Sequence, residues 1–220
     1  MNPIASNLAL RVDRQFEFQK EIDEISRLNW SGLSQDDLTG AAWAYYYFSI
    51  QFRESLGIGR LLHPADEKLR RLEQEECDTN NLSPWPGVAR IGEKMNHDEF
   101  MRRLLKLSSI PAQRRRGLEE IGQAYLVRTR KMDPVARGLS IASYEDGGLE
   151  SVFRAMLQSP HWDTPLLRAF KHFLTEHIRF DNEPGGHGTL SRHLTIDDQI
   201  LPLWTAFKDL FVESVPRLSA

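Results

Sequence analysis

The chain holds a single cysteine, Cys77, among 220 residues. An intramolecular disulfide and a cysteine-rich zinc site are therefore both excluded. The longest apolar stretch, around residues 41–50, is far shorter than the roughly 20 residues that cross a membrane. The first residues, MNPIASNLALRVDRQ, lack the basic start and the long apolar run of a signal peptide. We therefore expect a cytoplasmic protein with no membrane segment.

The chain also lacks an excess of basic residues. Lysine and arginine number 28 and aspartate and glutamate 31, so the formal net charge is −3. Nucleic-acid binding proteins usually carry a strong positive charge, so we expect no nucleic-acid partner. Hydrophobic residues make up 40% and charged residues 27%, which is typical of a folded globular protein. The length favours one domain that spans residues 1–220.

Several catalytic motifs are missing from the sequence. No histidine has a glutamate three residues before it, which excludes the Glu-x-x-His pairs of ferritin-like di-iron bundles. A His-Glu-x-x-His zinc-protease helix, a phosphate-binding Walker loop and a Gly-x-Ser-x-Gly nucleophile turn are also absent. The chemistry therefore has to come from a less common pattern.

Apolar residues recur at three- and four-residue steps along almost the whole chain, and this period predicts helices with little or no sheet. Gly57 and Gly59 are expected to end the second helix, and Gly147-Gly148 to interrupt the sixth. Ser34 with Asp37, and Thr195 with Asp198, form capping patterns that predict the starts of the second and the last helix. Asp133-Pro134 predicts the start of a further helix, and Thr164-Pro165 predicts a cap with a first-turn proline. We expect an all-α, compact helical bundle. The predicted helices span about residues 8–28, 34–56, 65–77, 97–107, 111–131, 133–159 and 164–182, with a last helix after residue 195.

The stretch EHIRFDNEPGGHGTLSRHL, residues 176–194, is the most informative segment. His177 and Asp181 are four residues apart and would share one face of a helix. They could both ligate one metal ion, or Asp181 could orient the imidazole of His177. The break at 184–186 brings His187 near them. An ordinary surface pair on a helix is the alternative interpretation, which the spacing alone does not exclude.

His177-Ile178-Arg179-Phe180-Asp181 followed by His187-Gly188 resembles the last core helix of the heme-oxygenase-like superfamily. That superfamily includes the TenA thiaminases, the PQQ-synthesis oxidase, the chlamydial folate-synthesis oxidase and heme-oxygenase-like di-iron oxygenases. An aromatic helix at 45–52, an acidic helix end at 72–77 and a histidine-led helix at 96–100 are similar to the superfamily's upstream elements, and 144–150 resembles a later glutamate-bearing helix.

The resemblance implies a heme-oxygenase-like bundle that holds iron, in one or two ions, and uses O2 to oxidise a small organic substrate. Manganese or zinc would also suit histidine and carboxylate ligands. Glu73 or Glu75 could replace Glu76 as a ligand, and Glu150 could replace Glu145. The implied metal ligands are Glu76, His97, Glu145, His177, Asp181 and His187.

The chain departs from the di-iron pattern in two places, and one of them is the loop at 78–90, which lengthens the gap between Glu76 and His97 to 21 residues. The first glutamate of the di-iron members would align near residues 48–50, which hold Phe, Ser and Ile, and Glu54 lies about one turn later. A mononuclear site, a weak second site or a lost site are therefore open alternatives. Two further hypotheses are a heme-oxygenase-like protein that binds heme or another small molecule without this metal site, and a noncatalytic helical module. The chain could also form a homodimer.

Overall fold

The computed structural model describes residues 16–76, 84–182 and 185–220. Within these ranges the chain is mainly helical and contains no strand, and an isolated bridge joins Trp85 to Ala89. The predicted all-α class is therefore confirmed. The predicted helix start near residue 8 and the predicted helix end at Cys77 lie outside the described residues.

The helices follow one another with short connections. Short turns that are not regular α-helix lie between some of the helices and after the last one. They are Trp30–Gly32, Leu105–Leu107, Tyr144–Gly148, Asp198–Ile200 and Pro216–Ser219. The α-helices are α1 (Glu17–Ser26), α2 (Gln35–Leu62), α3 (Glu67–Glu76), α4 (His97–Leu104), α5 (Ala112–Arg130), α6 (Pro134–Ser143), α7 (Leu149–Met156), α8 (Pro165–Asp181), α9 (His187–Ser191) and α10 (Leu201–Ser214).

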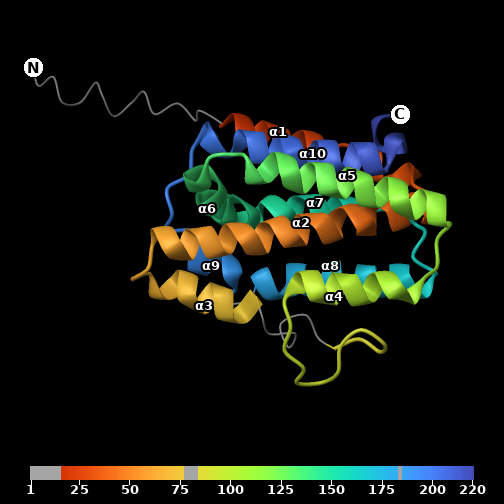
Figure 1. Cartoon of the computed structure of the whole chain (residues 1–220), viewed down its shortest axis with the longest axis horizontal. Coiled ribbons are helices and arrows are strands. Elements are labelled where there is room, and N and C mark those ends of the chain that lie inside the picture. Colours follow the sequence, from red (N-terminus) through yellow and green to blue (C-terminus); the bar gives the residue numbers. More distant parts are fainter. Residues whose placement is uncertain (1–15, 77–83, 183–184) are drawn as a thin grey trace, which may run out of the picture.

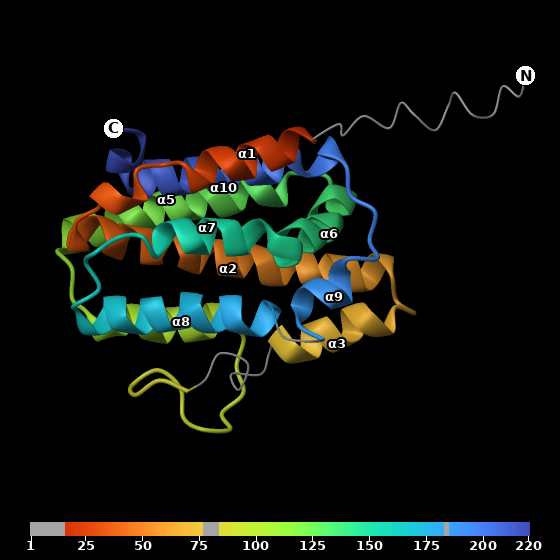
Figure 2. The same ribbon diagram turned by 180° about the vertical axis from the view of Figure 1, so that it is seen from behind.

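Helix α2 forms the middle of the bundle (Figures 1 and 2). On one side of it lie α1, α5, α6, α7 and α10, and on the other side lie α3, α4, α8 and α9. Helix α2 contacts α3, α4, α5, α6, α8 and α10 directly. Aromatic side chains of α2 fill the core, where Tyr45 packs on Phe153 and Phe173, and Phe48 packs on Phe207. Among the described helices, none is long and apolar enough to span a bilayer.

Helix α2 begins where the sequence predicts but ends later. Ser34 and Asp37 form the reciprocal cap, with Ser34 Oγ accepting from Asp37 N at 3.2 Å and Asp37 Oδ2 accepting from Ser34 N at 3.0 Å. The predicted break at Gly57 and Gly59 is wrong, because the helix continues to Leu62. A glycine costs an α-helix only about 1 kcal/mol relative to alanine, and tertiary contacts of α2 with its neighbours outweigh that cost.

The predicted cap of the last helix is also wrong. Asp197, and not Thr195, caps the turn before α10, with its carboxylate accepting from Gln199 N at 2.9 Å. Asp198 instead accepts from Phe18 N at 3.3 Å and so ties this turn to α1. The predicted caps at Asp133 and Thr164 are correct, since each side chain accepts a hydrogen bond from the first turn of its helix.

Candidate metal centre

The six candidate ligands come together between α2 and the layer made by α3, α4, α8 and α9. Each ligand lies at or near the end of its element, and every one except the partly buried Asp181 is buried. They are Glu76 at the end of α3, His97 at the start of α4, Glu145 in the turn between α6 and α7, His177 and Asp181 on α8, and His187 at the start of α9.

Glu76 lies at the middle of the group. Its Oε2 lies 2.7 Å from Nδ1 of His97, and its Oε1 lies 3.1 Å from Nδ1 of His187. One carboxylate therefore contacts two histidines that come from different helices. Of the three neighbouring acids that the sequence offered, Glu73 points to Arg60 at 3.3 Å, and Glu75 lies at the edge of the cluster with its Oε2 3.7 Å from Nε2 of His187.

His187 is surrounded by carboxylates. Its Nδ1 lies 3.2 Å from Glu145 Oε2 and 3.6 Å from Asp181 Oδ1, in addition to the contact with Glu76. Ligand atoms of Glu76, Glu145 and His187 all lie within 4.8 Å of one another, so these three residues could hold a metal ion. Glu150, the alternative to Glu145, instead pairs with Arg154 at 2.6 Å.

The two remaining histidines stand side by side. The ring centroids of His97 and His177 are 4.8 Å apart, with an angle of 72° between the planes. His177 Nδ1 lies 3.2 Å from the Phe173 carbonyl oxygen, which can only accept, so Nδ1 carries the proton. His97 Nδ1 likewise faces the Glu76 carboxylate. Because Nδ1 of each ring faces an acceptor, Nε2 is the ring nitrogen left to bind a metal ion.

The local backbone explains how Glu145 reaches the cluster. Residues Tyr144–Gly148 form a wide, kinked turn between α6 and α7, in which Asp146 and Gly147 leave helical backbone geometry and Gly147 has φ of +91°. Such wide turns frequently occur at functional sites. Gly188 lets α9 approach this turn, since a Cβ at this position would lie 2.9 Å from the Glu145 carbonyl oxygen. The ion pair of Arg192 with Asp146 at 2.6 Å fastens α9 to the same turn.

The buried charges shift one another's pKa. Burial alone would lower the pKa of His187, but the carboxylates of Glu145, Glu76 and Asp181 outweigh burial and raise this pKa to about 9. Burial alone would raise the pKa of Glu76, but His97 and His187 outweigh burial and lower it to about 2. Without a metal, Glu76 is therefore ionised and His187 is protonated at neutral pH.

The pKa values of Asp181, Glu145 and His177 shift toward the neutral forms of these side chains. Burial, with Glu145 nearby, raises the pKa of Asp181 to about 8, and burial also raises the pKa of Glu145. Burial lowers the pKa of His177 to about 3. In each case burial away from water disfavours the charged form of the side chain.

Several polar atoms of the cluster have no hydrogen-bond partner although they are buried. The contacts around His187 are close but lack hydrogen-bond geometry. Buried polar groups nearly always have hydrogen-bond partners in folded proteins. A concentration of buried atoms without partners is therefore a sign of side chains that ligate a cation. The donor set of imidazole nitrogens and carboxylate oxygens fits a transition-metal ion. The unsatisfied atoms are His97 Nε2, Glu145 Oε2, Asp181 Oδ1 and both ring nitrogens of His187.

The structure adds residues that the sequence did not single out as site residues. A hollow of about 10 Å³, enough for roughly one water molecule, touches Glu76, His97 and His177 and is walled by Tyr45, Phe48, Ser49, Phe52 and Leu149. Burial and the nearby Glu76 carboxylate raise the pKa of Tyr45 well above its usual value. A buried tyrosine hydroxyl among acids is a signal that spacing in the sequence does not carry.

The position of the missing first glutamate is now visible. Phe48 and Ser49 occupy the wall of the hollow, where they offer no carboxylate. Glu54 points elsewhere and pairs with Arg130 at 2.6 Å and Arg137 at 3.1 Å. Among the described residues that line this hollow, the His97 and His177 side therefore has Glu76 and Glu145 as its only carboxylates.

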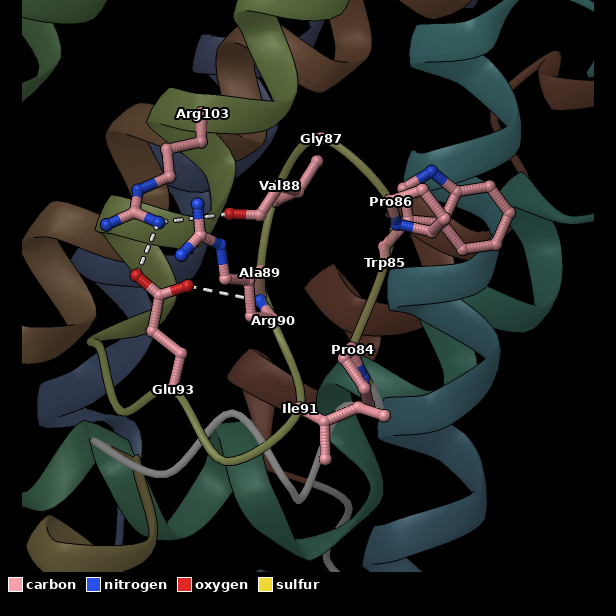
Figure 3. Close-up of a pocket in the computed structure, with 10 residues that line it drawn as sticks. All are labelled: Pro84, Trp85, Pro86, Gly87, Val88, Ala89, Arg90, Ile91, Glu93 and Arg103. Atoms are coloured by element: carbon pink, nitrogen blue, oxygen red, sulfur yellow. Dashed lines mark hydrogen bonds and ion pairs between the residues drawn. The ribbon is translucent and has the colours of Figure 1, made fainter.

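A larger pocket of about 800 Å³ lies away from the cluster, at the loop that follows residue 83 (Figure 3). Arg103 reaches into it and pairs with Glu93 at 2.7 Å, and it donates to the Val88 carbonyl at 3.2 Å. The rest of its described lining is mainly apolar or backbone, including Trp85 and Ile91. No described residue that lines this pocket is a histidine, and Glu93 is its one carboxylate, so the described lining offers no group of metal ligands comparable to the central cluster.

The fold and the site together define an all-α protein with a buried group of acids and histidines that could hold a metal ion. In comparisons with protein-family models, curated proteins and solved structures, none matched this chain.

Proposed function

We propose that this protein is a nonheme metal-dependent oxidase or oxygenase of the heme-oxygenase-like type, which uses iron and O2 to oxidise a small organic substrate. The observation that carries the proposal is the group of buried ligand atoms without hydrogen-bond partners on His97, Glu145, Asp181 and His187. A purely structural ion-pair network would satisfy these atoms within the protein.

The donor set supports iron in particular. Imidazole and carboxylate ligands with open coordination positions are typical of nonheme iron enzymes, and manganese and zinc accept the same ligands. When bound, iron supplies the ability to react with O2 and to remove electrons from the substrate.

The arrangement of the ligands supports two neighbouring sub-sites. His97 and His177 lie on one side of Glu76, and Asp181 and His187 lie on the other, while Glu145 borders both sides. Because the two oxygens of Glu76 face different histidines, this carboxylate is the group placed to connect two ions. The side with two histidines has fewer carboxylates, so we expect it to bind its ion more weakly.

The surrounding side chains would keep the site dry. Phe173 packs on His177 with ring centroids 4.3 Å apart, Phe153 packs on the same ring at 5.7 Å, and Phe180 packs on His187 at 4.6 Å. Exclusion of water strengthens the electrostatic interactions of the ligands and limits side reactions of an oxidising centre.

Metal analysis of the protein purified without added metal is the first test, and it should find close to one or two ions of iron per chain, or of manganese or zinc in its place. Anaerobic addition of Fe(II), followed by O2, should then produce a visible absorption band. Titration with heme is the matched control, and it should give no Soret shift. Failure to retain any of these metals, or a Soret shift with heme, would refute the proposal.

A further inference from the structure

A chamber of about 280 Å³ lies beside the metal cluster, between α2, α3 and α4. It shares four lining residues with the small hollow at the cluster: Ser49, Phe52, Glu76 and His97. The chamber and the hollow are therefore neighbours that share these four side chains as a common wall. The volume of the chamber is just below the usual range for small-molecule sites, about 300–1,000 Å³.

The walls of the chamber differ in polarity. Helix α2 contributes the apolar Phe52 and Leu56 together with Ser49 and Arg53, whereas α3 and the start of α4 contribute Glu73, Glu76 and His97, with the Asn96 amide beside them. An occupant would thus meet two apolar side chains on the α2 side and mainly hydrogen-bonding groups on the other.

The charged side chains at the rim already have partners. Arg53 pairs with Asp98 at 3.0 Å, and Glu73 pairs with Arg60 at 3.3 Å. Neither sign of charge dominates the rim, so a strongly anionic ligand such as a nucleotide would find no excess of positive charge. The chamber suits a small amphipathic molecule without a strong net charge.

Gly57 lines the chamber from the last two turns of α2. A Cβ at this position would meet no atom within 4 Å, whereas a Cβ at Gly59 would lie 3.4 Å from the Gly138 carbonyl of α6. The first carbon of a side chain at position 57 therefore has open space around it, and the absence of a side chain leaves room at this wall of the chamber.

We propose that this chamber is the substrate site and that Gly57 sets the size of the substrate it admits. The occupant is a small amphipathic organic molecule that lays its apolar side on Phe52 and Leu56 and directs its polar end toward Glu76 and His97. This inference rests on the proposed metal-dependent function, because it assigns the substrate to one side of that centre.

The test compares Gly57→Phe and the smaller Gly57→Leu with Gly117→Phe. Gly117 is a matched control, since its Cβ in α5 would also meet no atom within 4 Å and it does not line the chamber. Each protein is loaded with iron and oxidised to Fe(III), and it is then titrated with azide and with 4-nitrocatechol while the absorption spectrum is recorded. Azide is small, and the catechol carries an aromatic ring that needs the chamber.

We expect Gly57→Phe to weaken 4-nitrocatechol binding by at least about tenfold and Gly57→Leu to weaken it less. Azide binding should stay unchanged in both, and Gly117→Phe should bind both probes like the unmodified protein. Far-UV circular dichroism and iron content establish that each variant is folded and loaded, and Gly57→Leu decides the test if Gly57→Phe does not fold.

Iron-loaded Gly57 variants that bind the catechol as tightly as the unmodified protein would overturn the chamber assignment and leave the proposed function standing. Equal loss of azide and catechol binding would also overturn it, since the substitution would then disturb the metal centre itself. If the unmodified protein takes up no iron, the proposed function fails, and this inference fails with it.

Discussion

Glu145→Gln separates a metal ligand from a structural buried acid. The amide has nearly the shape of the carboxyl but cannot carry its charge. In the metal-free protein, burial raises the pKa of Glu145, so the ionised side chain is an unfavourable element of the fold. Its replacement also removes the contact with His187. These effects oppose each other, and we expect the metal-free stability to change by no more than about 1 kcal/mol.

The metal-loaded protein should respond differently. A metal present at 100 times its dissociation constant stabilises the fold by about 2.7 kcal/mol, or about 5–11 °C in melting temperature for a chain of this size. Even residues that only support metal ligands change the affinity 10–100-fold when mutated. A tenfold loss at the same metal concentration leaves about 1.4 kcal/mol, so Glu145→Gln should at least halve the metal-dependent rise.

The assay is thermal unfolding with Mn(II), which avoids oxidation, and with a chelator. Glu150→Gln is the matched control, because Glu150 lies five residues later on a partly exposed surface and pairs with Arg154. We expect this control to keep the full metal-dependent rise. An unchanged rise in Glu145→Gln, or an equal loss in both variants, would refute the assignment of Glu145 as a ligand.

Three further substitutions test other parts of the structure. His177→Ala should lower the number of metal ions bound per chain, while circular dichroism shows nearly unchanged helix content. Exposed His161→Ala is the control, and unchanged metal stoichiometry in His177→Ala would contradict the assignment. Gly188→Ala places a Cβ 2.9 Å from the Glu145 carbonyl oxygen. It should lower the free energy of unfolding in urea by about 1–3 kcal/mol and weaken metal binding. Unchanged stability and unchanged metal affinity would show that the close approach of Gly188 is not needed. Glu54→Ala removes the partner of buried Arg137. It should lower the free energy of unfolding by about 1–3 kcal/mol in the same assay but leave the metal content unchanged. A loss of metal would mean that Glu54 takes part in the site.

The sequence predicts those parts of the fold that depend on short-range chemistry. The caps at Ser34, Asp133 and Thr164 are correct because each depends on a side chain and a backbone amide a few residues away. The predicted end of the second helix at Gly57 and Gly59 is wrong because tertiary contacts can override a residue that disfavours helix. Such contacts are not visible in a local sequence pattern. The fold type within the all-α class stays a prediction.

The candidate site shows the same division. His177 and Asp181 lie on one helix, so their spacing alone predicts that they share a face. The choice of Glu145 over Glu150 depends on the kinked turn Tyr144–Gly148: Glu145 within it lies 3.2 Å from His187, whereas Glu150 beyond it pairs with Arg154. Tyr45 enters the site through the packing of α2 against α8, a long-range contact for which the sequence contains no local signal.

The six candidate ligands are distributed over five elements: α3, α4, the kinked turn Tyr144–Gly148, α8 and α9. No two of these elements form a site by themselves, so ion capture requires the assembled tertiary structure and cannot survive in a fragment. Release of the ion during denaturation therefore reports the cooperative loss of the whole bundle, and a bound coloured metal would serve as an internal probe of its folding.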